Sequence, residues 1–256
     1  MDVRKEMKMG LRAIADMLMP RVCIVCGCRL LRHERNLCMA CLTDMPLTRF
    51  WERSHNPMAD RFNAVIQAGL EDCGPYEPYV HAAALFLYHS EAGYRQIPYQ
   101  IKYHGNIDAG RHLGSMIGKR LASSTLWKDV DMVIPVPLHW SRKWKRGYNQ
   151  AEVIGAAVAY ELSVPMRTDI LIRKRRTKTQ TKLDIKEKAR NVAGAFAVRE
   201  DAAVIFRGGG SIRHIILLDD IFTTGSTLGA CFAALRSVFP PSVRISVTTL
   251  GFVGHI

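Results

Sequence analysis

Residues 215–218 form a continuous apolar run, Ile-Ile-Leu-Leu, which leads directly into Asp219 and Asp220. An apolar run without polar alternation is typical of a strand that is buried on both faces of a parallel sheet. In open α/β sheets, ligands bind beyond the carboxyl ends of such strands. The sequence therefore predicts a parallel sheet with Asp219 and Asp220 at a ligand site.

A short turn rich in hydroxyl groups follows the two acids and precedes the apolar spacing of an amphipathic helix over 228–235. A helix N-terminus offers backbone N–H groups and a partial positive charge, so this turn suits a phosphate monoester. Carboxylates repel phosphate, and we therefore expect Asp219 and Asp220 to bind sugar hydroxyls or a metal ion. Together these features predict a ribose 5-phosphate site, while a plain helix cap with two solvated acids is the alternative. The candidate phosphate ligands are Thr223, Thr224, Gly225, Ser226 and Thr227.

Two Cys-x-x-Cys pairs lie near the start of the chain, with eleven residues between them. Two such pairs can direct four thiolates at one tetrahedral Zn²⁺, and a site filled by four protein ligands is structural rather than catalytic. A pair of redox disulfides is the alternative, but it fits less well because no βαβ pattern surrounds the pairs. Cys28 could compete as a ligand, although the paired spacing favours the other four cysteines. The predicted zinc ligands are Cys23, Cys26, Cys38 and Cys41.

The length of the chain and its composition suit two units. A chain of 256 residues with 48% hydrophobic content can bury one sizeable core and carry a small appendage. We predict an N-terminal helix, zinc-ribbon-like module and linker over 1–60, followed by an α/β domain over 61–256. Residues 11–20 have helical apolar spacing, and no stretch reaches the ~20 apolar residues of a membrane span. The few cysteines outside the pairs favour a cytoplasmic protein.

Strands and helices alternate along the second unit. This alternation predicts a doubly wound, mostly parallel sheet. Residues 46–74 have no regular pattern, and we predict an irregular segment there. The expected strands cover 82–88, 131–136, 195–198, 215–218 and 243–250, and the expected helices cover 111–122, 149–162 and 228–235.

The net charge of +13 is concentrated in one part of the chain. Residues 139–190 contain 14 of the 36 Lys and Arg residues against five acids, and such a field attracts polyanions. The segment 173–180 is basic and lacks apolar periodicity, which favours a mobile lid. The segment 139–150 follows a predicted buried strand, so we expect a second loop at the same sheet edge, with pyrophosphate as its ligand. The candidate ligands in this loop are Arg146, Tyr148, Asn149 and Gln150.

These motifs together resemble the ComF family of competence-associated proteins, which are similar to type I phosphoribosyltransferases. The resemblance spans most of the chain from Cys23 to Leu250. Its motifs are the two cysteine pairs, Ile-Lys-Tyr-His-Gly at 101–105, Pro-Val-Pro-Leu at 135–138, Arg-Gly-Tyr-Asn-Gln at 146–150, the basic stretch 175–180, Arg-Asn at 190–191 and the acidic motif.

The resemblance implies a Mg²⁺-dependent site for phosphoribosyl pyrophosphate (PRPP) and transfer of its ribosyl phosphate with release of pyrophosphate. The resemblance implies that Asp219 and Asp220 hold the ribose hydroxyls, and that either acid could also stabilise the positive charge that develops on the sugar. No motif identifies the acceptor. A non-catalytic PRPP sensor, a protein that binds single-stranded DNA, and a partner of a competence helicase or other uptake protein therefore remain alternatives.

Overall fold

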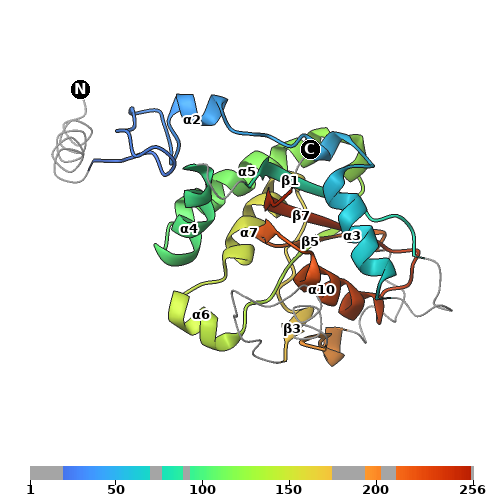
Figure 1. Ribbon diagram of the computed structural model, residues 1–256. Helices are drawn as coiled ribbons and strands as arrows, with labels where there is room; N and C mark the ends of the chain where they lie inside the picture. The colour runs from blue at the N-terminus through green and yellow to red at the C-terminus, as the bar shows by residue number, and fades with distance from the viewer. Residues whose placement is uncertain (1–19, 70–76, 89–92, 175–193, 203–211, 255–256) are drawn as a thin grey trace, which may run out of the picture.

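The computed structural model describes residues 20–69, 77–88, 93–174, 194–202 and 212–254. Their centre is a parallel sheet with the strand order β1-β7-β5-β2, and β6 extends it by pairing with β7 (Figure 1). Every residue of β5 is buried, as its apolar run predicts. The strands are β1 (Ala82–Leu87), β2 (Met132–Pro135), β5 (His214–Leu218), β6 (Ile221–Phe222) and β7 (Arg244–Phe252).

Helices cover both faces of this sheet. On one side α5 (Ile107–Ser123) packs against α7 (Gln150–Leu162), and on the other α3 (Pro57–Gln67) packs against α10 (Ser226–Arg236) (Figure 1). The contact between α5 and α7 is close because Gly114 has no side chain, and a Cβ there would lie 2.7 Å from a backbone oxygen of α7. The predicted mostly parallel, doubly wound α/β class is therefore confirmed.

The remaining elements are short. Two strands, β3 (Leu171–Arg173) and β4 (Phe196–Val198), form an antiparallel pair that contacts α10. The other helices among the described residues are α2 (Met39–Thr43), α4 (Gln96–Tyr103) and α6 (Trp140–Arg146), with 3-10 turns at Phe50–Glu52, Gly93–Arg95 and Thr125–Trp127.

The prediction of an irregular segment over 46–74 is wrong, because α3 lies within it. Asn56 caps this helix, and its Oδ1 accepts hydrogen bonds from the backbone N–H groups of Met58 and Ala59 at 3.1 and 3.0 Å. Pro57 follows at the first helical position, where a missing N–H costs nothing. The helix runs across residue 60, and the domain boundary predicted there stays a prediction.

The prediction of a loop over 139–150 also needs correction, because most of the segment is the helix α6. His139 caps its start, and Gly147, at φ 80°, ends it. None of its residues is buried, so the helix leaves no apolar stripe in the sequence by which it could be recognised.

Several predictions fall outside the described residues. The amphipathic helix at 11–20 lies there except for its last residue, as do the basic stretch 175–180 and the Arg-Asn motif at 190–191. Among the described helices, we find none with both the length and the apolar character needed to cross a membrane.

Candidate functional site

The acidic pair and the loop after β2 lie at the same edge of the sheet. Pro135 at the end of β2 is the register partner of Leu218 at the end of β5, and the backbone N–H of Val136 donates to Leu218 O at 2.8 Å. Asp219 and Asp220 follow Leu218 directly. Since both strands end here, the chain after each of them turns into the same region, as predicted.

The backbone fixes both carboxylates. Asp219 Oδ1 accepts from the backbone N–H of Asp220 at 2.8 Å, and Asp220 Oδ1 accepts from that of Ile221 at 2.9 Å. The backbone oxygen of Asp220 in turn accepts from Leu250 and Gly251 on β7. The second carboxylate oxygen of Asp220, Oδ2, lies 2.6 Å from the Lys102 ammonium nitrogen. Asp220 is buried, and its partner comes from α4, far away in the sequence.

The charges of these three side chains depend on one another. Burial and the adjacent Asp220 raise the pKa of Asp219 to about 7. Burial acts to lower the pKa of Lys102, but the attraction of Asp220 outweighs it and the net pKa is raised. Lys102 therefore stays protonated near neutral pH, and the two acids together with Lys102 carry at most one net negative charge.

The hydroxyl-rich turn leads into the N-terminus of α10, as predicted. Gly225 caps the helix at φ 79°, and a Cβ at this position would lie 2.8 Å from the Phe222 ring, so the position favours glycine strongly. The hydroxyl groups of Thr224 and Ser226 are 2.9 Å apart. The backbone N–H groups of the first helical turn have no intrahelical acceptor by geometry, and with these hydroxyls they form a set of donors suited to an anion.

The four candidate residues between the end of α6 and the start of α7 divide into two pairs. Arg146 Nη1 donates to Gln150 Oε1 at 3.1 Å, and its guanidinium lies 5.3 Å from the centre of the Tyr103 ring. Tyr148 and Asn149 use their polar groups to hold the backbone instead. The hydroxyl of Tyr148 donates to the backbone oxygen of Ile101 on α4.

Asn149 is almost completely buried and joins β2 to α7. Its Oδ1 accepts from the Ala151 N–H and its Nδ2 donates to Val136 O, both at 3.0 Å. This side chain is a helix cap, which fixes the direction in which α7 leaves the edge of the sheet.

Two basic residues at this edge were missed as site residues. Lys102 belongs to the Ile-Lys-Tyr-His-Gly motif, which contributes to the family resemblance. No local sequence pattern, however, indicates that its side chain contacts Asp220. Arg173, which we predicted to begin the lid, lies on β3 with its guanidinium 5.1 Å from the centre of the Phe196 ring. Burial lowers the pKa of Arg173, and the nearby Asp219 partly opposes that effect. Residues 175–180 of the predicted lid lie outside the described part of the chain.

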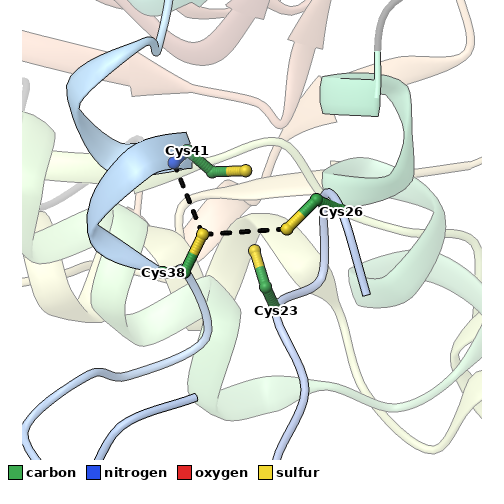
Figure 2. A group of neighbouring side chains, drawn as sticks. All are labelled: Cys23, Cys26, Cys38 and Cys41. Carbon is green, nitrogen blue, oxygen red and sulfur yellow. Dashed lines mark hydrogen bonds between the residues drawn. The ribbon is translucent and has the colours of Figure 1, made fainter. Parts of the chain in front are cut away.

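The four predicted zinc ligands come together in a second candidate site, shown in Figure 2. Their sulfur atoms all lie within 4.8 Å of one another, and those of Cys26 and Cys38 are 3.7 Å apart. A tetrahedral zinc with Zn–S bonds of ~2.3 Å requires sulfur–sulfur distances of ~3.8 Å. The residues therefore fit a zinc ion. Burial and the sulfur of Cys26 raise the pKa of Cys41, so a bound cation is needed to favour its thiolate.

Glu34 stabilises the loop between the cysteine pairs, a role that its position in a polar loop did not reveal. Its carboxylate accepts from the backbone N–H groups of Leu31 at 2.6 Å and Met39 at 2.7 Å. These hydrogen bonds lower the pKa of Glu34. Met39 begins α2, so the carboxylate ties the loop to the helix that carries Cys41.

The zinc module contacts the rest of the chain through α5 and the turn before α4. Asn36 Nδ2 donates to Asp108 Oδ2 at 2.8 Å, and Arg35 pairs with the same carboxylate at 3.3 Å. The Tyr94 hydroxyl donates to the backbone oxygen of Cys41 at 2.8 Å. Besides these polar contacts, Leu30 and Leu37 of the module belong to the same hydrophobic core as the α/β fold.

Curated proteins with related sequences are linked with competence and DNA use. Competence protein F of Haemophilus influenzae is 32% identical over 115 residues, which are 45% of this chain and 48% of that protein. DNA utilization protein YhgH of Escherichia coli K12 is 32% identical over 98 residues, which are 38% of this chain and 40% of that protein. The chain thus spans about half, or less, of the length of these relatives. No protein-family model matches the sequence.

Two solved structures show weak similarity to the chain. A glutamine PRPP amidotransferase from B. subtilis is 17% identical, with 55% of this chain and 26% of that chain covered and a TM-score of 0.33. An adenine phosphoribosyltransferase from Trypanosoma brucei is 13% identical, with 77% and 79% covered and a TM-score of 0.35. The parallel strand pairing, rather than these low scores, defines the fold class.

Proposed function

We propose that this chain, which is a ComF family protein, binds PRPP with Mg²⁺ at the carboxyl edge of its sheet. The observation that carries the proposal is the juxtaposition of two fixed carboxylates with the N-terminus of α10. Asp219 and Asp220 would bind the ribose hydroxyls, and the turn Thr223 to Thr227 would bind the 5-phosphate through its backbone N–H and hydroxyl groups.

The pyrophosphate would bind on the side of Arg146 and Gln150. Arg146 sits at the end of α6, and a guanidinium recognises phosphate oxygens with two parallel donors. When bound, Mg²⁺ would neutralise charge on the pyrophosphate; it prefers hard oxygen ligands, which PRPP itself supplies. Tyr148 and Asn149 would support the site indirectly, because their hydrogen bonds fix α4 and α7 around it.

Transfer of the ribosyl phosphate to an acceptor is part of the proposal. Departure of pyrophosphate leaves positive charge on the sugar, so transfer requires that the leaving group be neutralised and water be excluded. Arg146 provides a fixed cation for the first task. A protein that only senses PRPP would bind it through the same residues but would release no pyrophosphate. Release of pyrophosphate in the presence of an acceptor therefore distinguishes a transferase from a sensor.

The test is calorimetric titration of PRPP with Mg²⁺ into the zinc-loaded protein and into an Asp219→Asn, Asp220→Asn double variant. We expect the double variant to bind at least about a hundredfold more weakly, because each lost hydrogen bond to a charged group costs ~1.5–3 kcal/mol. Asp201→Asn, at an exposed acid paired with Arg199, is the matched control and should bind like wild type. Binding that is equal in all three proteins would contradict the proposal.

A nucleic-acid-binding role is the second candidate, and it is favoured by the exposed aromatic side chains of α6. Trp140 and Trp144 are 75% and 89% exposed, and their spacing of four residues places them on one side of the helix. The last turn of the same helix carries three basic residues, Lys143, Lys145 and Arg146. Exposed aromatic rings among basic side chains are typical of proteins that bind single strands, and the names of the curated relatives agree with a role in DNA uptake.

Fluorescence anisotropy with a single-stranded oligonucleotide tests this candidate. We expect a Trp140→Ala, Trp144→Ala double variant to lose ~1–3 kcal/mol of binding free energy per stacked base. Wild-type affinity should also fall steeply with salt. Tyr160→Ala, which removes an 82% exposed ring from α7, is the matched control. If the tryptophan and tyrosine variants bind equally well, α6 is not the interface.

A further inference from the structure

The ion pair between Lys102 and Asp220 joins helix α4 directly to the acidic pair at the end of β5. Lys102 lies in the last turn of α4, and Asp220 follows β5. Their charged atoms are 2.6 Å apart, the Asp220 side chain is 8% exposed, and that of Lys102 is 25% exposed. This contact is largely buried, as is the ion pair between Arg236 and Glu77, whereas pairs such as Arg35–Asp108 are exposed.

Helix α4 is held so that Lys102 reaches the acidic pair. Ile97 and Ile101 are buried in the core, and the hydroxyl of Tyr148 donates to the backbone oxygen of Ile101. Arg146 lies over the ring of Tyr103, the residue after Lys102. The residues on both sides of Lys102 are thus fixed by residues of the segment that we assign to pyrophosphate.

The charge of Lys102 answers a difficulty in the proposed function. Two adjacent carboxylates repel a ligand with several phosphate groups, and this repulsion is strong at a partly buried site. The charged groups that face Lys102 are Asp219, Asp220 and Arg146. A single ammonium group in contact with Asp220 cancels one of the two negative charges and leaves the other Asp220 oxygen bonded to the Ile221 N–H.

Resting on the proposed function, we propose that Lys102 is a positioning residue of this site, whose positive charge holds Asp220 in place and lets the acidic pair accept a sugar polyphosphate. Its role is electrostatic and not merely that of a hydrogen-bond donor. Loss of the charge should therefore weaken ligand binding even where a donor remains.

The experiment compares Lys102→Gln, which keeps a donor without the charge, with Lys102→Arg, which keeps the charge. Calorimetric titration of PRPP with Mg²⁺ should show affinity at least about tenfold lower for the Gln variant and recovery to within about threefold of wild type for the Arg variant. Lys119→Met, at an exposed position of α5, is the matched control. Thermal unfolding of each protein without ligand shows whether the variants remain folded, and Lys102→Asn, which also keeps a donor without the charge, replaces the Gln variant if that protein is unfolded.

The outcomes separate this inference from the proposed function. If wild type binds PRPP and the Gln variant binds equally well, the role of Lys102 is overturned while the PRPP site stands. A folded Arg variant whose affinity for PRPP is as low as that of the Gln variant would show that the positive charge is not sufficient. That result would also overturn the proposed role of Lys102. If folded wild type binds no PRPP, both proposals fail.

Discussion

At the scale of single residues, Gly225 combines a left-handed backbone with a lack of room for any side chain. It has φ 79°, and a Cβ would lie 2.8 Å from the Phe222 ring. Gly147 has nearly the same φ, 80°, with nothing within 4 Å of its Cβ position. Gly225→Ala should lower the free energy of unfolding by roughly 2–4 kcal/mol, and Gly147→Ala by only ~1 kcal/mol, because the first adds overpacking to the same backbone strain. Urea denaturation measures both, and equal losses would contradict the role of Phe222.

Asp219 should make stability depend on pH in the direction opposite to an ordinary acid. Its pKa is raised from 3.8 to about 7 in the folded protein, so between these values the folded state binds more protons than the unfolded state. Stability from this group is therefore present at acid pH and falls as the pH rises through that window. Asp219→Asn should remove this contribution, so that its stability rises more with pH than that of wild type, whereas Asp44→Asn, at an exposed position, should keep the wild-type slope. Denaturant unfolding from pH 4 to 8 compares the two variants with wild type, and a wild-type slope in the Asp219→Asn protein would contradict the prediction.

At the scale of elements, His214 links three segments beneath the end of the sheet opposite the ligand site. It is fully buried on β5, with Nδ1 3.1 Å from Asp129 and Nε2 2.8 Å from the Ser246 hydroxyl on β7. Burial and the nearby Arg244 lower its pKa from 6.5 to about 4. Between these values the unfolded state binds more protons, so the stability that His214 contributes is present above about 6.5 and is lost as the pH falls.

We expect His214→Gln to remove the rise in stability with pH that His214 contributes between about 4 and 6.5, and to lower stability at neutral pH as well. Thermal unfolding across this range measures both effects. His33→Gln, at an exposed position of the zinc module, should keep the wild-type slope. A wild-type slope in the His214→Gln protein would assign the pH dependence to other groups.

The elements that the sequence predicted are those whose burial leaves a local pattern. The sheet was predicted from the apolar runs of β2, β5 and β7, and its covering layer from the helical spacing of α5 and α7. Once β5 was recognised as a strand, the acids that follow it were placed at the carboxyl edge of the sheet. Helix α6 was missed because none of its residues is buried. Helix α3 was also missed, although Asn56 and Pro57 are a recognisable signal for its start. The Lys102–Asp220 contact was beyond reach, because it depends on how α4 packs and not on any neighbouring residues.

At the scale of the whole molecule, the zinc module and the α/β fold should respond separately to loss of metal. The module touches the remainder through polar contacts at Asp108 and Tyr94 and through buried side chains such as Leu30 and Leu37, while most of the shared hydrophobic core lies in the sheet and its helices. Binding of a structural zinc is worth ~10–16 kcal/mol in small modules, so these contacts alone cannot maintain the module without the ion. Chelation should therefore abolish hydrogen-exchange protection over 21–44 and leave that of β5 and β7 intact.

Variants at single cysteines test which thiols hold the metal. Cys38 lies in the cluster of four sulfurs and also caps α2, where its Sγ accepts from the Cys41 N–H at 3.5 Å. Cys28 is exposed and is not one of those four, and its thiol lies beside those of Cys26 and Cys38. Cys38→Ser should therefore lose the single equivalent of zinc and the protection of the module, whereas Cys28→Ser should keep both. Metal analysis of the purified proteins measures this, and a Cys28→Ser protein without zinc would make Cys28 a ligand in place of one of the four.

If β5 and β7 also lost protection in the Cys38→Ser protein, the two units would fold as one, because the module would then be required for the sheet.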